Sequence, residues 1–531
     1  MAHEDFNSPH VLGSDIALGD DFSTTALLRA HAAARASAVA IRDGERQRTY
    51  GELSDNAHRV AQQLLKARVQ PGHRICFLAR NRLEFFELWF GCAWIGAALV
   101  PLNWRLTPHE LAPQIVDSCA RLVFTEHEFA AGLTDLLDEE VVDIDLSWTE
   151  WLQADNEVEL PDPAGAAKSR DRAVLQQYTS GTTGIAKGVI ITESNLGHYL
   201  NATELLAIDA GSVVLGVPPL FHIGGINLAL SCLHAGGEYV LLGDFTTEGV
   251  LDLIESHRIT NAFLVPSMIA MLLDDHTVST RDFSSLRRIV YGASPITSTT
   301  LRRAIDVFGV EVTQVYGMTE TTGAVCQLMP ADHDPDGPRE HLLRSAGKPY
   351  PWVELRVVDF ASGVRKDVGN VGEVQIRAVQ STPGYWHRDE ATNQLRTDEG
   401  WLRTGDAGWI DAEGYLYLVD RVKDMIVSGG ENVYPAEVEN EIAKHPAVRD
   451  VAVIGVPDPK WGEAVKAIVV VNQGHALSEA ELLDGLRDRL AGYKRPKSVD
   501  FVETLPRNAN GKLLKRALRE NYWPENERLI G

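Results

Sequence analysis

The segment with the clearest chemical potential is a loop of small and hydroxyl-bearing residues that leads to a lysine. It runs from Tyr178 to Val189 and reads Tyr-Thr-Ser-Gly-Thr-Thr-Gly-Ile-Ala-Lys-Gly-Val. Small residues let backbone N–H groups converge on an anion, hydroxyl groups add donors, and the lysine adds a positive charge. The spacing is not that of a Walker A loop, because Ala186 precedes the lysine and Gly188 follows it. The segment predicts a phosphate cradle made of Thr179, Ser180, Gly181, Thr182, Thr183, Gly184 and Lys187.

A second segment, Gln314–Thr322, reads Gln-Val-Tyr-Gly-Met-Thr-Glu-Thr-Thr and follows an apolar run. It places an aromatic ring, a glycine, hydroxyl groups and a carboxylate in succession. Carboxylate oxygen is a ligand that hard cations such as Mg²⁺ prefer. Taken alone, Glu320 would be as well explained as a solvated loop acid.

Five further segments carry polar or glycine-rich patterns, of which Asp420–Val438 is as specific as the first loop, whereas the lone His, the Thr-Gly-Asp turn and the basic tail are weak in isolation. The five segments are Pro218–Gly225, Tyr291–Ile296, Trp401–Asp406, Asp420–Val438 and Leu505–Arg516. A histidine after a phenylalanine is more often a packed core residue. An Asp beside a Gly is usually a turn residue, and a basic terminus is usually frayed.

Taken together, these motifs resemble those of the acyl-adenylate-forming superfamily. That superfamily includes acyl-CoA synthetases, aryl-CoA ligases, nonribosomal adenylation domains and beetle luciferases, and the resemblance covers nearly the whole chain. One departure is Ala186, where the family more often has Pro. This change should loosen the loop slightly without removing a phosphate ligand.

The resemblance implies roles for residues around the nucleotide. Tyr316 would pack on adenine, Thr319 would contact the α-phosphate, and Glu320 would help to hold Mg²⁺. Asp406 would accept hydrogen bonds from two ribose hydroxyls, as a carboxylate in a Thr-Gly turn is suited to do. The other residues assigned to the nucleotide are Ala293, Ser294, Pro295, Gln314, Gly317 and Met318.

The resemblance also implies roles in catalysis and acid binding. Lys512 would touch both the carboxylate and the α-phosphate, because a compact ammonium lowers the barrier between two anions. His222 would stand near the substrate carboxylate. The residues assigned to the acid pocket are Gly224, Gly225, Tyr291, Gly292, Gly323 and Ala324.

A hinge between two domains is implied by the charged passage at Asp420–Asp424. Arg421 would contact the ribose or phosphate, and Lys423 would be the pivot. A small mobile C-terminal domain would rotate about this hinge between the two half-reactions. The residues that would then border the thiol tunnel are Ser428, Gly429, Gly430 and Glu431.

The activity implied is ligation of a carboxylic acid to coenzyme A through an acyl-adenylate, with ATP and Mg²⁺. Small residues in the pocket suggest an aryl, cinnamoyl-like or medium-chain acid. One alternative is an acyl-AMP ligase that loads a phosphopantetheinyl carrier protein. Another is an enzyme of a biosynthetic cluster that activates a different oxyanion or uses a different nucleophile. A non-catalytic nucleotide-binding regulator would not need Glu320, Lys512 and the hinge together.

Composition narrows the class of protein. The 531 residues carry a net charge of −24, which makes a broad surface for nucleic acid or anionic membrane improbable. Five cysteines without C-x-x-C spacing indicate neither a disulfide framework nor a zinc site, so a reducing cytoplasm is expected. No stretch has the character of a signal peptide or a membrane span. The oligomeric state is left open, with a homodimer as one option.

The elements that must position these motifs follow an α/β pattern. Apolar strand-like runs, such as Arg74–Leu78 and Arg288–Tyr291, alternate with helical patterns. After Leu355 the strands become shorter and richer in turns, which indicates a β-rich subdomain. From Ala436 a small α/β domain is expected. The predicted organisation is an N-terminal domain of layered α/β subdomains with a β-rich subdomain over residues 1–421, and a C-terminal domain over residues 422–531.

Overall fold

The computed structural model describes most of the chain and divides it into two compact units. The first unit comprises Met1–Glu354 and Arg377–Gly400, and the second comprises Leu355–Ile376 and Trp401–Gly531. The residues that the structure describes are 17–134, 136–137, 139–153, 158–161, 172–179, 186–294, 296–421, 424–428, 431–458, 461–487, 489–490, 492–507 and 513–523. The predicted boundary between residues 421 and 422 stays a prediction.

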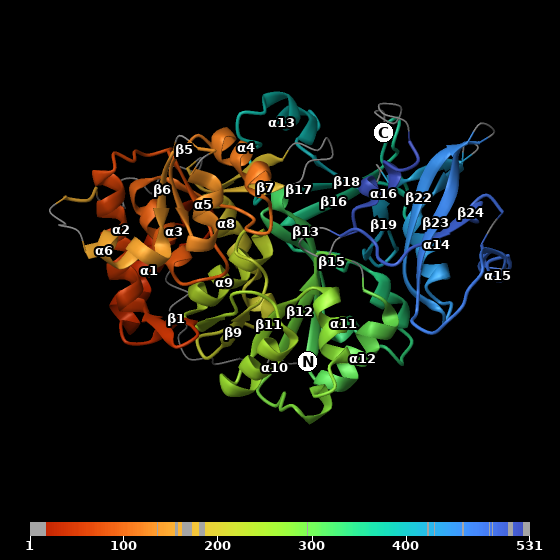
Figure 1. The fold of residues 1–531 in the computed structure, drawn as a ribbon, viewed down its shortest axis with the longest axis horizontal. Coiled ribbons are helices and arrows are strands. Elements are labelled where there is room, and N and C mark those ends of the chain that lie inside the picture. Colours follow the sequence, from red (N-terminus) through yellow and green to blue (C-terminus); the bar gives the residue numbers. More distant parts are fainter. Residues whose placement is uncertain are drawn as a thin grey trace, which may run out of the picture. The chain divides into compact units, whose positions relative to one another are not determined.

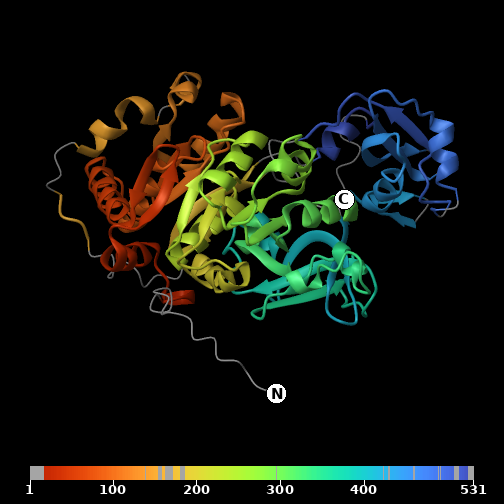
Figure 2. The same cartoon turned by 90° about the horizontal axis from the view of Figure 1, so that it is seen from below.

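Two sheets form the first unit (Figures 1 and 2). One has six strands in the order β6-β5-β3-β4-β7-β8, and the other has nine in the order β15-β14-β13-β12-β11-β9-β10-β1-β2. Most neighbours are parallel, whereas β7–β8 and β13–β14 are antiparallel hairpins. The strands are β1 Val39–Asp43, β2 Arg46–Thr49, β3 Arg74–Leu78, β4 Ala98–Pro101, β5 Ala120–Thr125, β6 Glu140–Asp143, β7 Ala173–Thr179, β8 Lys187–Thr192, β9 Val213–Gly216, β10 Glu238–Leu241, β11 Asn261–Leu264, β12 Arg288–Gly292, β13 Glu311–Met318, β14 Gly323–Leu328 and β15 Lys348–Pro349.

Successive strand residues alternate between an inner core and two outer cores, as the period of two in a β-strand requires. In β3, Ile75 and Phe77 lie in the inner core, which also contains residues of α3, α9 and the other sheet. Cys76 and Leu78 lie in an outer core with α4 and α5. The other sheet packs its outer face on α10, α11 and α12. The first unit is therefore a layered α/β structure.

Helices α3 and α9 are buried almost throughout, because they lie in the inner core with residues of both sheets. Their apolar sequences suit this position, since a helix that is hydrophobic on all sides must be covered on all sides. The helices of the first unit are α1 Thr24–Arg35, α2 Tyr50–Lys66, α3 Glu84–Ile95, α4 Pro108–Ser118, α5 His127–Thr134, α6 Ile144–Gln153, α8 Glu193–Tyr199, α9 Ile223–Ala235, α10 Thr247–Ser256, α11 Pro266–Asp274, α12 Ser298–Phe308 and α13 Asp389–Leu395.

The second unit contains two smaller sheets. One has the order β16-β17-β18-β19, and the other has the order β21-β20-β23-β22 with β24 paired to β23. Helices α14 and α15 pack on one face of this second sheet, and α16 packs on the other face. The elements are β16 Val353–Val358, β17 Gly372–Ala378, β18 Leu402–Ile410, β19 Leu416–Arg421, β20 Ile426–Ser428, β21 Glu431–Val433, α14 Pro435–Ile442, β22 Val448–Asp458, β23 Gly462–Val471, α15 Glu479–Gly485, β24 Ser498–Phe501 and α16 Lys515–Arg519.

The predicted fold class is confirmed: a large α/β region precedes a short-stranded β sheet and a small α/β domain. One local expectation was wrong. The Thr-Gly-Asp segment is no turn but lies within β18, where Gly405 has φ of +67°. The pairing of β18 with its neighbours shifts register on either side, so this segment is an irregular, bulge-like part of a strand.

Candidate functional site

The β7–β8 hairpin presents the predicted phosphate cradle. Thr179 and Lys187 are its last paired residues, so the hairpin brings the two ends of the loop together. The predicted residues Ser180, Gly181, Thr182, Thr183 and Gly184 lie outside the described residues. A half-buried tyrosine supports the hairpin, because the Tyr178 hydroxyl donates a 2.8 Å hydrogen bond to Asp117.

The Gln314–Thr322 motif forms the end of β13 and a single 3₁₀ turn, Thr319–Thr321. The turn is tight because the Thr321 hydroxyl accepts a 3.0 Å hydrogen bond from the Met318 amide. Glu320 lies in this turn with only 7% of its surface exposed. The predicted nucleotide contacts Gln314, Tyr316, Gly317, Met318 and Thr319 therefore occupy one strand and the turn that follows it.

Tyr385, which the sequence motifs did not point to, lies against both Lys187 and Glu320. Its hydroxyl donates a 2.9 Å hydrogen bond to Glu320 Oε1. Lys187 Nζ lies 5.1 Å from the centre of the same ring, in the geometry of a cation–π contact. The predicted phosphate lysine and the predicted metal carboxylate are thus neighbours of one aromatic side chain.

The carboxylate of Glu320 has the properties of a cation ligand. It is buried, it takes a neutral donor from Tyr385, and no arginine or lysine in the described part of the chain forms an ion pair with it. A buried charge without a counter-ion is costly. A divalent cation would supply that counter-charge, so the donor chemistry fits Mg²⁺.

The segment 380–386 joins these two motifs through its backbone. The Thr382 amide donates to the Glu320 carbonyl (2.8 Å), and the Trp386 amide donates to the Gly188 carbonyl (2.7 Å). The Gln380 side chain donates to the Thr321 and Ala324 carbonyls. This segment therefore links β8 to the turn that carries Glu320.

Gly292 is the last residue of the buried strand β12, and Ala293 and Ser294 follow it directly. Ala293 has φ of +66°. The predicted residue Pro295 lies outside the described residues. The Tyr291 ring packs in the outer core with α10–α12, so its predicted place in the acid pocket stays a prediction.

His333, which sequence reasoning also missed, anchors Tyr291. Its Nδ1 lies 2.8 Å from the Met329 carbonyl, which can only accept a hydrogen bond, so Nδ1–H is the donor. Nε2 therefore accepts from the Tyr291 hydroxyl at 2.9 Å. Burial lowers the pKa of His333 to about 4, which keeps the imidazole neutral and able to accept this bond at physiological pH.

His222 immediately precedes α9, and its ring lies 4.5 Å from the Phe221 ring. Gly224, two residues later, has room for a β-carbon, which would lie in ordinary van der Waals contact with Phe263 at 3.7 Å. At Gly225 a β-carbon would lie only 2.5 Å from the Pro219 carbonyl oxygen. Both His222 and Gly224 are partly exposed.

Most of the predicted pocket glycines lie where neighbouring atoms leave no room for a side chain. A β-carbon would lie 2.3 Å from the Val315 carbonyl at Gly292 and 2.2 Å from the Asn227 side-chain amide at Gly323. Gly317, assigned to the nucleotide, is similar, since its β-carbon would lie 2.0 Å from the Gly323 carbonyl. These glycines thus report tight packing against a neighbouring strand or, at Gly323, against α9. They do not by themselves indicate room for a bulky acid, and Ala324 is likewise buried in β14.

The second unit carries the remaining predicted residues. Asp406 is 6% exposed and lies opposite Arg421 in the β18–β19 pairing. Ser428 pairs with Glu431 where β20 and β21 form a hairpin. The predicted residues Lys423, Gly429, Gly430 and Lys512 lie outside the described residues.

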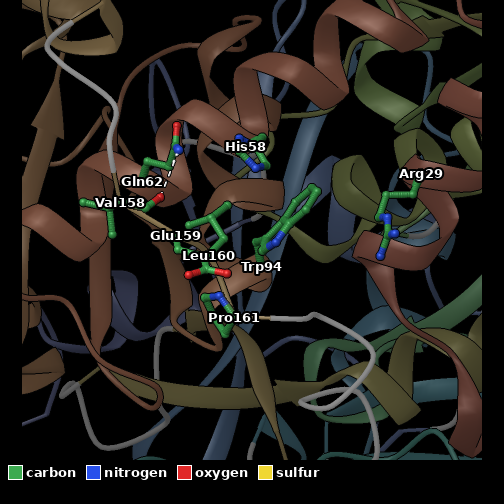
Figure 3. Close-up of a pocket in the computed structure, with 8 residues that line it drawn as sticks. All are labelled: Arg29, His58, Gln62, Trp94, Val158, Glu159, Leu160 and Pro161. Carbon is green, nitrogen blue, oxygen red and sulfur yellow. Dashed lines mark hydrogen bonds between the residues drawn. The ribbon is translucent and has the colours of Figure 1, made fainter.

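A cavity of about 380 Å³ lies elsewhere in the first unit (Figure 3). Helices α1, α2 and α3 and the segment 158–161 contribute its walls. No predicted site residue is among those that line it, which are Arg29, His58, Gln62, Trp94, Val158, Glu159, Leu160 and Pro161.

Among the described residues, no group of three or more His, Cys, Asp or Glu side chains is placed to hold a metal ion. No helix in the same residues has the length and apolar character needed to cross a bilayer.

Two family models and several characterised proteins match most of this chain. A family model described as AMP-binding enzyme matches residues 28–386, and one described as AMP-binding enzyme C-terminal domain matches residues 437–512. The fatty acid–[acyl-carrier-protein] ligase ScoC of Streptomyces coeruleorubidus is 37% identical over 91% of this chain and 93% of its own length. A feruloyl-CoA synthase of an Amycolatopsis species is 38% identical over 91% of this chain and 96% of its own length.

A solved structure is also similar over nearly the whole chain. It is o-succinylbenzoate CoA synthetase from Bacillus subtilis in complex with its acyl-adenylate intermediate. The TM-score is 0.83 at 32% sequence identity, and the match covers 93% of this chain and 97% of that one.

Proposed function

Because the chain belongs to the AMP-binding enzyme family, we propose that it is an ATP-dependent ligase that converts a carboxylic acid to an acyl-adenylate and then to its coenzyme A thioester. The observation that carries this proposal is the position of Tyr385 between Lys187 and Glu320. A phosphate-binding lysine and a metal-binding carboxylate must lie close together if both are to hold one triphosphate.

In the first half-reaction the chain's residues bind and orient two anions. Lys187 and the hairpin loop hold the β- and γ-phosphates, Tyr316 packs on adenine, and Thr319 contacts the α-phosphate. Glu320 would hold Mg²⁺, which when bound would offset charge on the phosphate oxygens. Lys512 places its ammonium beside the attacking carboxylate and the α-phosphate, where negative charge develops.

In the second half-reaction a thiol must reach the mixed anhydride while water is excluded. We assign the thiol route to Ser428–Glu431 and the ribose contacts to Asp406 and Arg421. Rotation about Lys423 would exchange Lys512 for this face. A cytoplasmic location and assembly into a homodimer stay predictions.

The acid is proposed to be an aryl, cinnamoyl-like or medium-chain acid. A feruloyl-CoA synthase at 38% identity supports the first two classes, and a fatty acid ligase at 37% identity supports the third. The same fatty acid ligase supports a second candidate function, in which the acceptor is a carrier protein in place of coenzyme A.

A pyrophosphate-release screen tests the proposal. Purified enzyme is given ATP, Mg²⁺ and a panel of aryl, cinnamoyl, fatty and small polar acids, and the products are identified by mass spectrometry. Active acids are then tested with coenzyme A and with a phosphopantetheinylated carrier protein. A thioester on coenzyme A supports the first function, and acylation of the carrier alone supports the second. Failure of every acid to release pyrophosphate would refute both.

A further inference from the structure

We infer that Tyr385 is a positioning residue that fixes both Glu320 and Lys187, so that the affinity for ATP becomes dependent on the divalent cation. The inference rests on the proposed function, because it assigns the cation to Glu320 and the phosphates to Lys187. Tyr385 itself touches neither ATP nor the acid in this scheme. Its effect is transmitted through the two residues that it contacts.

The segment that contains Tyr385 holds Glu320 at two points. The Thr382 amide binds the Glu320 main-chain carbonyl, and the Tyr385 hydroxyl binds its side-chain Oε1. The carboxylate is thereby restricted to one rotamer, with its second oxygen left for a cation. Partners of this kind orient a metal ligand before the metal arrives.

The same segment is joined to the strand that carries Lys187. Tyr385 forms a β-bridge with Val189, and the Ile190 amide donates a 3.1 Å hydrogen bond to the Gly384 carbonyl. The Tyr385 ring is therefore fixed relative to β8, and its face attracts the Lys187 ammonium. One rigid connection sets the distance between the lysine and the carboxylate.

The hydroxyl of Tyr385 acts as a donor and not as a base. Its oxygen lies 2.9 Å from Glu320 Oε1, and the phenol supplies the hydrogen of that bond. Removal of the hydroxyl alone should release Glu320 but leave the ring over Lys187.

Equilibrium binding of ATP separates these effects. ATP affinity is measured by calorimetry for the wild type and Tyr385→Phe, once in EDTA and once with saturating Mn²⁺. We expect Tyr385→Phe to lose about tenfold in the affinity gained from the metal, as loss of a ligand-orienting partner typically does. Its metal-free affinity should match the wild type. Tyr385→Leu should weaken metal-free binding as well, because it also removes the aromatic face.

Tyr417→Phe is the matched control. Tyr417 also lies near a carboxylate, Asp411, but it belongs to β19 of the second unit. It should leave both affinities unchanged. An unaltered metal dependence in Tyr385→Phe would overturn the inference, and so would an equal loss with and without metal, which indicates a structural role. The assay needs no acid, so it is independent of the acid screen, and wild-type protein that binds no ATP would refute the proposed function itself.

Discussion

Single residues decide how large the acid pocket can be, and Gly224 is the glycine whose replacement tests its size. Its neighbours leave room for a β-carbon, whereas those of Gly292, Gly317 and Gly323 do not. Gly224 also follows His222, the residue proposed to stand near the substrate carboxylate. The size of the acid should therefore depend on position 224.

Replacement of Gly224 by leucine should shift selectivity toward smaller acids. We expect kcat/KM for a cinnamoyl-type acid to fall roughly 10- to 100-fold relative to a short-chain acid, because added methylene groups in a pocket discriminate by about that factor. Pyrophosphate release with paired acids measures the ratio. Gly485→Ala is the control, since no atom lies within 4 Å of a β-carbon at that position. An unchanged ratio would place the acid elsewhere.

The residue scale also shows what the sequence could and could not predict. Motifs pointed to Lys187 and Glu320, which the structure places at the end of a hairpin and in a turn after a strand, because such patterns are local in the chain; the roles of both residues stay predictions. Tyr385 and His333 were missed, because each acts through a partner far away in sequence: 65 residues for Tyr385 and 42 for His333. The glycines were interpreted as open space, whereas most of them accommodate neighbouring backbone.

At the scale of elements, the β13–turn–β14 hairpin is a tight unit that must keep its shape to present Glu320. Gly317 pairs with Ala324 and Met318 pairs with Gly323 there, directly after a shift in register, and Thr322 and Gly323 both have positive φ. The alternation of strands with helices was predictable from apolar runs in the sequence. The irregular β18 was not, because Thr-Gly-Asp is equally typical of a turn.

Gly317→Ala should damage this hairpin. The added methyl would lie 2.0 Å from the Gly323 carbonyl oxygen, which is backbone and cannot simply rotate away. We expect a loss of about 1–3 kcal/mol in stability, typical of overpacking, and a marked loss of ATP affinity. Thermal unfolding and ATP calorimetry measure both. Wild-type stability together with wild-type ATP binding would show that the two strands can separate without cost.

At the scale of the molecule, the two half-reactions are assigned to different parts of the chain. Lys512→Ala should abolish formation of the acyl-adenylate but largely spare thioester formation from supplied acyl-adenylate, because a group used in one step need not serve the other. The two steps are measured separately by pyrophosphate release and by mass spectrometry of the thioester. Equal loss of both would refute this division of roles.

Acid stability is a second property of the whole molecule. Burial lowers the pKa of His234 to about 4, compared with 6.5 for a free histidine, and also lowers the pKa of His31. Between pH 6.5 and 4 the unfolded chain therefore binds protons that the folded chain does not. The contribution of these two histidines to stability should therefore be greatest above pH 6.5 and should fall as the pH drops toward 4.

His234→Leu should reduce this acid sensitivity. Neither ring nitrogen of His234 has a hydrogen-bond partner among the described residues, so leucine removes the titration without breaking such a bond. The slope of stability against pH should decrease by about 1.4 kcal/mol per pH unit in that window. Melting temperatures at pH 7, 6 and 5 measure it, and parallel curves for variant and wild type would contradict the assignment.

The path of the chain between the two units has a practical consequence for protein engineering. The first unit is discontinuous, since Arg377–Gly400 belongs to it although the preceding Leu355–Ile376 does not. A fragment that ends at Glu354 would therefore contain Lys187 and Glu320 but would lack Tyr385, which contacts both. Any fragment meant to bind nucleotide by itself must extend to residue 400, and it would therefore include Leu355–Ile376, which belongs to the second unit.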